Sequence, residues 1–383
     1  MNMATMTNRP IAPTRDGHIS LTRGVPPLES LPVAALVSHA ADVLKDAAAV
    51  AFQYAPLGGH LGDHALREQL GLFHGVEPDS IFVGNGSLQV LDLLTTLLVS
   101  DQRVTRVYVE APTYDRALTL FARHKLEIIG IPLHSDGLDI DQLSTYLCAS
   151  TPAFIYTIPD FQNPSGITMS TEKRSALVRL ALTHGVTIIE DIPYRELRYN
   201  GTKAPSLAEL ASGATVLTIG SLTKILSPGL RIGYAITDPP LARSLARLAE
   251  DTYLSPSPLC QLVAARCFRN GVVHDNIIHV CELLRPRHDA AVASINRLIP
   301  GALISIPDGG YFLGILLTTE VAESRFIGAA REAGVLLTVG SSFYPKPLSA
   351  PKRTLFIRLP FQGLAAEDFA SAIETIVAIS KDQ

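Results

Sequence analysis

Short runs of β-branched and apolar residues alternate along the chain with amphipathic segments. We predict strands at five such runs, residues 104–109, 153–157, 186–190, 215–219 and 232–236. Between them apolar residues recur at helical spacing, and the segment 172–184 ends at Gly185, a residue type that often caps helix C-termini. Strands that alternate with helices form a mainly parallel sheet covered on both faces. The pattern therefore predicts an α/β domain.

The order of elements changes beyond Arg285 and Pro286. There the pattern predicts a helix at 287–298, hairpin-like strands around 309–312, a helix at 325–333, a strand at 354–359 and a closing helix. This order is typical of a small α+β domain. We therefore predict an N-terminal arm and part of the small domain at 1–50, a large domain at 51–285 and a small C-terminal domain at 286–383.

The composition narrows the class of protein. Of 383 residues, 47% are hydrophobic and 18% are charged, which excludes a disordered chain and a coiled coil and favours a large core or subunit interface. No apolar run reaches the ~18 residues of a membrane span, so we expect no membrane association. The net charge is −4 without a basic stripe, which argues against a nucleic-acid partner.

The cysteines and the N-terminus point to a cytoplasmic protein. The N-terminal residues lack the apolar core of a secretory signal. The four cysteines form no CxxC pair, and we expect buried free thiols and no metal site; they are Cys148, Cys260, Cys267 and Cys281.

Reactive side chains follow four of the predicted strands. In chain order they are Tyr114, Asn163, Asp191, Tyr194, Ser221, Lys224 and Arg231. Because ligands bind at the carboxyl ends of the strands in an open α/β sheet, we expect these side chains to lie close together. An aromatic ring, an amide, a carboxylate, a phenol, a hydroxyl and two cations suit a flat, cationic, phosphorylated heterocycle.

Each of these signals is weak when it is taken alone. A single lysine such as Lys224 is usually solvated, Asp191 after a strand is often a loop or helix-capping residue, and residues 163–166 (NPSG) are a turn signal. Residues 84–87 (GNGS) precede an apolar helix predicted at 88–99. They fit a turn with an N-cap, and equally a phosphate cradle at a helix N-terminus.

Taken together and in this order, the motifs resemble those of fold-type I pyridoxal 5′-phosphate (PLP) enzymes. The resemblance is to class I/II aminotransferases near the 2-aminoadipate and kynurenine aminotransferase group, and it covers about residues 18–380. Its most specific stretches are 161–166 (FQNPSG), 191–194 (DIPY) and 220–234 (GSLTKILSPGLRIGY). It implies a PLP-binding large domain at 51–285, with a mixed and mainly parallel sheet, and a smaller α+β domain.

The resemblance also implies roles around the PLP ring. Lys224 would hold the cofactor covalently and then move the proton from the substrate Cα. Asp191 would keep the pyridine nitrogen protonated, so that the ring withdraws electrons. Asn163 and Tyr194 would bond the phenolic oxygen of the ring, and Tyr114 would stack on its face.

For the phosphate, the resemblance implies a site shared between subunits. The backbone N–H groups of Ser87 and Leu88 would bind it, and Ser221 and Arg231 would complete the charge match. Tyr54, in the stretch YAPLGG, is similar to a tyrosine that reaches the phosphate of the neighbouring subunit in this family. A homodimer with shared active sites is therefore expected.

Substrate binding is less well defined by the motifs. Arg358 matches the arginine that clamps the substrate α-carboxylate, with Asn163 beside it, and its apolar neighbours in a predicted strand favour a buried position. Arg23 replaces a glycine of the family pattern, so a contact with a distal acidic group and a solvated position both fit. His60 and the segment 253–258 are further candidates for the pocket lining.

The expected reaction moves an amino group from an L-amino acid to a 2-oxo acid by a ping-pong mechanism, in amino-acid metabolism or biosynthesis. A PLP-dependent lyase, a β/γ-replacement enzyme or a cyclisation enzyme on the same fold is the alternative. A PLP-binding transcription regulator would carry a DNA-binding domain, for which the roughly 18 residues before the matched region are too few.

Overall fold

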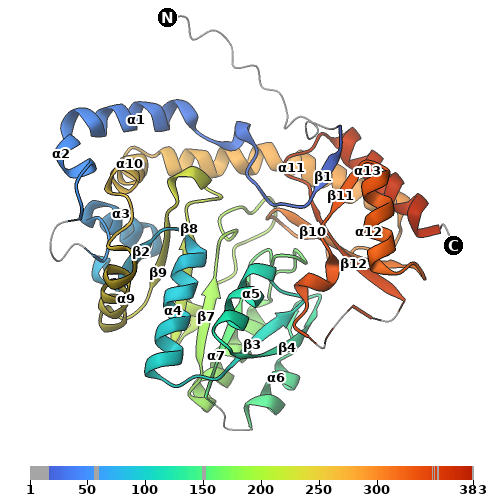
Figure 1. Cartoon of the computed structure of the whole chain (residues 1–383), viewed down its shortest axis with the longest axis horizontal. Coiled ribbons are helices and arrows are strands. Elements are labelled where there is room, and N and C mark those ends of the chain that lie inside the picture. The colour runs from blue at the N-terminus through green and yellow to red at the C-terminus, as the bar shows by residue number, and fades with distance from the viewer. Residues whose placement is uncertain are drawn as a thin grey trace, which may run out of the picture.

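A computed structural model describes residues 17–55, 60–148, 152–346, 348, 350–351 and 353–381. Residues 1–16 of the predicted arm and residues 56–59 of the YAPLGG stretch lie outside the described residues. Figure 1 shows a large sheet flanked by helices, with residues 312–337 and 354–381 gathered at one end of the molecule.

The central sheet has eight strands. Its order is β2 (Ile81–Gly84), β9 (Gly233–Ile236), β8 (Val216–Ser221), β7 (Thr187–Asp191), β6 (Ala153–Thr157), β3 (Arg106–Ala111), β4 (Glu127–His134) and β5 (Gly137–Leu138). The five strands from β8 to β4 run parallel, whereas β9 is antiparallel to both of its neighbours. All five strands predicted from the sequence are present, and the mixed, mainly parallel sheet is confirmed.

Three strands of the central sheet were not predicted, for local reasons. β2 is a run of only four residues, and β5 has only two. β4 contains Gly130 and Pro132, residue types that usually argue against a strand. Pro132 is placed opposite Ala111 at the end of the β3–β4 ladder.

Helices cover both faces of the sheet, as predicted. They are α4 (Ser87–Asp101), α5 (Asp115–Arg123), α6 (Ile140–Leu147), α7 (Thr171–His184), α8 (Leu207–Leu210) and α9 (Pro239–Tyr253). Successive residues of β6 point to opposite faces of the sheet and so belong to different hydrophobic clusters. Tyr156 packs in the hydrophobic cluster with residues of α4, α5 and α9, and Ile155 packs in the one with residues of α6 and α7. Helix α7 ends at Gly185, which has the predicted left-handed conformation with φ of 62°.

The C-terminal elements are α10 (Pro258–Arg269), α11 (Val272–Leu298), β10 (Phe312–Thr318), α12 (Glu323–Glu332), β11 (Val335–Leu337), β12 (Thr354–Pro360) and α13 (Ala366–Lys381). They differ from the prediction in two ways. Helix α11 runs without a break through Pro286, so a helix starting at 287 is wrong. The hairpin around 309–312 is also wrong, because β10 pairs antiparallel with the distant β12. The proposed boundary at 285/286 falls inside α11 and stays a prediction.

The N-terminal segment joins both ends of the molecule. Strand β1 (Ile19–Leu21) pairs parallel with β11, and α1 (Val33–Asp46), α2 (Ala48–Ala51) and α3 (His64–His74) follow. The described residues also include four short 3₁₀ helices, at Leu28–Ser30, Pro78–Ser80, Pro228–Leu230 and Gly340–Phe343. Because β1 pairs with β11 and the chain then continues to α1, residues 22–26 pass between the central sheet and the C-terminal strands.

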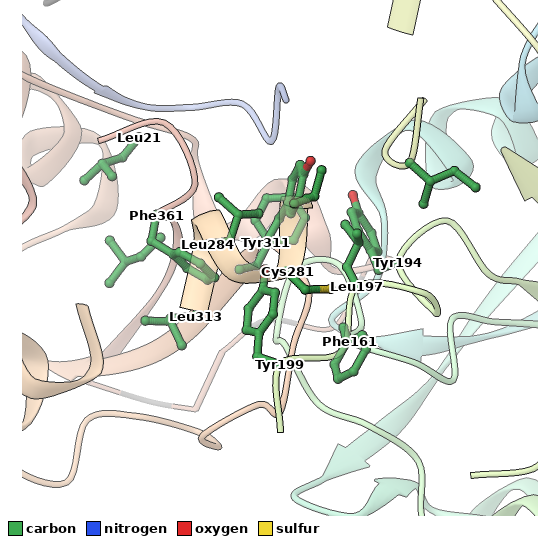
Figure 2. Packing of buried hydrophobic residues seen from close by; sticks show 14 of the residues in the cluster. Leu21, Phe161, Tyr194, Leu197, Tyr199, Cys281, Leu284, Tyr311, Leu313 and Phe361 are labelled. Atoms are coloured by element: carbon green, nitrogen blue, oxygen red, sulfur yellow. The ribbon is translucent and has the colours of Figure 1, made fainter. Parts of the chain in front are cut away.

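One hydrophobic cluster connects the sheet to the C-terminal elements. It brings Phe161 and Tyr194, which follow β6 and β7, together with Leu284 of α11 and with Tyr311 and Phe361 beside β10 and β12 (Figure 2). Tyr194 and Tyr311 lie with ring centroids 5.6 Å apart. This packing fixes the loops that follow the parallel strands.

Candidate active site

A cavity of about 590 Å³ lies where the parallel strands end, beneath residues 22–26. It brings together nearly all of the predicted site residues: Arg23, Ser87, Leu88, Tyr114, Asn163, Asp191, Tyr194, Ser221, Lys224, Arg231 and Arg358. Tyr54 does not line the cavity of its own chain; its side chain is 71% exposed on the segment after α2.

Asp191, the last residue of β7, lies at the bottom of this cavity. Its Oδ2 accepts a hydrogen bond of 2.7 Å from the Tyr156 hydroxyl, whereas its buried Oδ1 has no partner among the described residues. Burial raises the pKa of Asp191 to about 7, although the bond from Tyr156 acts in the opposite direction. A free carboxylate oxygen at this place suits a cationic N–H donor.

Lys224 reaches the cavity from the loop after β8. Its Nζ donates a hydrogen bond of 2.6 Å to the Gly24 carbonyl and lies over the rings of Tyr194 and Tyr311, at 5.7 and 5.2 Å. Burial, together with the positive charges of Arg358 and Arg23, lowers the pKa of this amine to about 7. A lysine of this kind can act as a nucleophile and as a base near neutral pH.

Arg358 lies in the middle of β12 and is 6% exposed, so the expected buried position is confirmed. Its two terminal nitrogens donate to Asn163 Oδ1 at 2.9 Å and to the Thr22 carbonyl at 2.6 Å. The guanidinium also stacks on Phe312 and Phe343, at 4.8 and 4.6 Å from the ring centroids. Burial lowers the pKa of this group below its usual range. The planar fork is thus held in place for a bidentate anion.

The loop that carries Asn163 depends on a buried network that the sequence analysis missed. The Gln162 amide donates to Glu110 Oε2 at 2.9 Å and to the Pro112 carbonyl at 2.8 Å, and its oxygen accepts from the Ser165 backbone N–H. Burial raises the pKa of Glu110 to about 7. The one signal in the sequence was the position of Glu110 at the end of a strand.

Charged groups behind the same loop are also paired. Asp160 accepts hydrogen bonds from Arg174 at 2.7 Å and from Arg195 at 2.9 Å, and all three side chains are buried. Arg195 follows Tyr194 directly, so this ion-pair network ties the loop after β6 to the loop after β7. The sequence contained no motif for it.

The N-terminus of α4 forms the third side of the cavity. Ser87 is its first residue, Gly86 is the N-cap with φ of 97°, and no side chain caps the helix. Gly86 thus provides the expected N-cap without a capping side chain, so the backbone N–H groups of the first turn remain available to a ligand. The backbone of Arg231 has the left-handed conformation, with φ of 54°, and its guanidinium donates a hydrogen bond to the Asn85 carbonyl at 3.2 Å. The arrangement suits a phosphate group.

We predict that Gly233→Ala disrupts this anion site. A Cβ at Gly233 would overlap the Ser87 backbone nitrogen, so β9 and the start of α4 would have to separate. Overpacking of this kind costs about 1–3 kcal/mol, and we expect the affinity for the phosphorylated cofactor that the motifs imply to fall roughly tenfold to hundredfold. Fluorescence titration of the cofactor measures it. Gly229→Ala is the control, because its Cβ would meet its nearest neighbour at 3.6 Å; equal losses in both variants would contradict the prediction.

Three minor predictions are corrected. His60 does not line the cavity of its own chain but lies 3.2 Å from Glu250 of α9, and residues 253–258 do not line it either. The four thiols are free, as expected, but Cys148 is exposed and Cys260 is half-buried.

Comparison with known proteins identifies the family. Residues 17–376 match the family of class I and II aminotransferases, and the chain belongs to it. It is 30% identical to aromatic-amino-acid aminotransferase 1 of Thermococcus litoralis, over 95% of this chain and 88% of that protein. It is also 28% identical to an uncharacterized HTH-type transcriptional regulator of Bacillus subtilis, YdfD, over 95% of this chain and 74% of that protein.

A solved structure with the same fold identifies the cofactor. LysN, the α-aminoadipate aminotransferase of Thermus thermophilus, matches with a TM-score of 0.87 and 28% identity, over 95% of this chain and 92% of that chain. It was solved with N-(5′-phosphopyridoxyl)-L-leucine. The chain is therefore a PLP-dependent transaminase of fold type I, and transamination is favoured over the lyase and cyclisation alternatives. Within the described residues, no helix is long and apolar enough to cross a membrane.

Proposed function

We propose that the cavity is the active site of this transaminase and that Lys224, Asp191 and Tyr194 are its catalytic residues. The observation that carries the proposal is that one cavity holds a lysine amine, a carboxylate with a free buried oxygen and a buried guanidinium. When bound, PLP supplies an aldehyde that condenses with amines and a ring that accepts the electron pair left at Cα. Asp191 Oδ1 is free for the ring nitrogen, and the start of α4 is free for the phosphate.

The side chains divide the remaining work. Arg358 and Asn163 bind the α-carboxylate, which fixes the orientation of Cα and its proton. Lys224 Nζ would take the Cα proton and would then donate a proton at C4′ of the cofactor. An amine with a pKa of about 7 can perform both transfers. Because the carboxylate is held by Arg358, the Cα–H bond breaks and the carboxyl group is retained. Tyr114 would pack on the ring, and Tyr194 would donate to its phenolic oxygen.

In this proposal the phosphate is bound by four residues, which are Ser87, Leu88, Ser221 and Arg231. The first two contribute the backbone N–H groups at the start of a 15-residue helix, where the helix dipole also favours an anion. Arg231 adds a full positive charge beside them. This division leaves the part of the cavity lined by Arg23 for the substrate side chain.

We further propose that Arg23 binds a distal carboxylate, so that dicarboxylic substrates are preferred. Arg23 lines the cavity and is the second cation, after Arg358, whose charge lowers the pKa of Lys224. Two cations that line one cavity favour a substrate with two carboxylates, such as 2-aminoadipate as donor and 2-oxoglutarate as acceptor.

Single-turnover spectra with a panel of L-amino acids test this preference. We expect the fastest conversion of bound cofactor with acidic donors, and Arg23→Gln should slow those donors by about 10²-fold while leaving apolar donors unchanged. Arg353→Gln is the control, because Arg353 is 77% exposed and pairs with Glu320. An equal loss for acidic and apolar donors in Arg23→Gln would contradict a role in recognising the side chain.

We also propose a homodimer in which Tyr54 reaches the phosphate of the partner subunit. Large apolar side chains are exposed along the N-terminal segment, including Val37, Val50 and Phe52 next to Tyr54. A face of this kind is expected to be covered by another protein surface. The cytoplasmic location, the biosynthetic role and the domain boundaries stay predictions.

Mixed dimers test the shared site. Lys224→Ala and Tyr54→Ala chains, each impaired alone at limiting PLP, should recover about a quarter of wild-type activity when coexpressed, because half of the dimers then contain one intact site. Without recovery, Tyr54 does not act across the interface.

A further inference from the structure

Tyr156 is the one hydrogen-bond partner of the Asp191 side chain among the described residues. Its hydroxyl donates to Asp191 Oδ2 at 2.7 Å, and it forms no other hydrogen bond to the described part of the chain. The second oxygen, Oδ1, is buried and has no hydrogen-bond partner in the described part of the chain. The two oxygens of this carboxylate are therefore distinguished by the protein itself.

The position of the Tyr156 hydroxyl is fixed by its surroundings. Tyr156 is fully buried in β6, in the ladder to β7 that ends at Asp191, where it lies opposite Ile189. Its ring packs edge-on against Phe121, with centroids 5.4 Å apart and planes at 73°. A fully buried side chain packed in this way has little freedom to turn the hydroxyl elsewhere.

The electrostatic surroundings give this bond weight. Asp191 raises the pKa of four neighbouring groups, Glu110, Tyr114, Tyr156 and Tyr194, none of which is a cation. The cations Lys224 and Arg358 line the same cavity. Burial disfavours the charged carboxylate, and the bond from Tyr156 is the influence that opposes it. Hydrogen bonds to buried charged groups contribute more than those between neutral groups.

We propose that Tyr156 is a positioning residue that keeps Asp191 ionised and turned so that Oδ1 faces the ring nitrogen of the cofactor. The inference rests on the proposed role of Asp191 toward PLP. In this proposal Tyr156, a β-strand residue outside the recognised motifs, contributes through Asp191 to the electron-withdrawing power of the cofactor ring. If Tyr156 only fills the core beside Phe121, its ring matters and its hydroxyl does not.

The holoenzyme tests the inference directly. The full chain is reconstituted with PLP labelled with ¹⁵N in its ring, and the ¹⁵N chemical shift reports how far the shared proton lies toward the ring nitrogen. We expect a pyridinium value in the wild type and a move toward the unprotonated value in Tyr156→Phe. Asp191→Asn separates the two proposals. If it leaves the shift unchanged, the proposed role of Asp191 fails; if it alone moves the shift, only the inference on Tyr156 fails.

Tyr108→Phe is the matched control. Tyr108 is also buried, on the neighbouring strand β3, but its hydroxyl donates to the Tyr146 carbonyl, away from the site. It should leave the ¹⁵N shift at the wild-type value. An equal displacement in both variants would show a general packing effect and overturn the inference.

A second measurement does not depend on the cofactor. In the full chain without PLP, ¹³C-labelled aspartate carboxyls are titrated, and the resonance lost in Asp191→Asn identifies Asp191. Tyr156→Phe should raise its proton affinity about ten- to hundredfold, one to two pH units in the midpoint. If Tyr156→Phe does not fold, 3-fluorotyrosine at position 156 keeps the shape and donates more strongly, so the midpoint should fall. An unchanged midpoint overturns the inference.

Discussion

Replacing Lys224 with alanine is expected to remove the visible absorbance of protein-bound PLP and to lower the transamination rate by about 10⁴-fold or more. The amine is the one lysine nitrogen in the cavity lining among the described residues, and two tyrosine rings lie beside it. Without this amine, the covalent attachment of the cofactor would lack its nucleophile and the transfer of the Cα proton would lack its base. Rapid-scan spectra and single-turnover rates measure the two losses separately.

The control for Lys224→Ala is Lys203→Ala. Lys203 is 46% exposed and pairs with Glu196 at 2.6 Å, so its removal should leave the spectrum and the rate unchanged. Added methylamine should partly restore the rate of Lys224→Ala, because a small amine can occupy the space of the lost side chain and act as a base. Wild-type absorbance in Lys224→Ala would refute the assignment.

The same lysine predicts a pH dependence. In the protein without cofactor, burial and two neighbouring arginines lower the pKa of Lys224 to about 7, so the nucleophilic neutral amine predominates above that pH. Below it, the rate of covalent PLP uptake should fall about tenfold per pH unit, and above it the rate should level off. An ordinary lysine would give a rate that still rises at about pH 9.

The sequence predicted which side chains meet at the edge of the sheet because these residues follow strands. Asp191, Asn163 and Lys224 each lie within a few residues of a strand end, and parallel strands bring their carboxyl ends to one edge of the sheet. Even modest errors in strand boundaries leave this argument intact. Glu110 and Asp160 were missed although they obey the same rule, because a buried carboxylate that serves other side chains carries no motif.

The other side of the cavity could not be predicted in the same way. Gly24 and Thr22 contact Lys224 and Arg358 across 200 and 336 residues of sequence, through backbone carbonyls that any residue type would provide. Strand β10 pairs with β12 across a helix and another strand. Such contacts are set by how the C-terminal elements pack on the sheet, and local periodicity contains no information about that packing.

Arg358→Leu is expected to lower kcat/KM for amino acids by about 10²–10³-fold, or about 3–4 kcal/mol, while PLP stays bound. The guanidinium is buried between Phe312 and Phe343, so its charge acts on a carboxylate with little screening by water. Its bonds to Asn163 and Thr22 leave it oriented before the substrate arrives. The loss should therefore affect substrate binding and the alignment of Cα together.

Two comparisons separate recognition of the carboxylate from damage to the fold. Arg358→Lys keeps the charge without the planar fork, so kcat/KM should fall between the wild type and Arg358→Leu. Amines that lack an α-carboxylate should react equally slowly with all three proteins, since they give Arg358 nothing to bind. If Arg358→Leu slows such amines as much as it slows amino acids, the arginine supports the site through its contacts with Asn163 and Thr22, and the carboxylate is bound elsewhere.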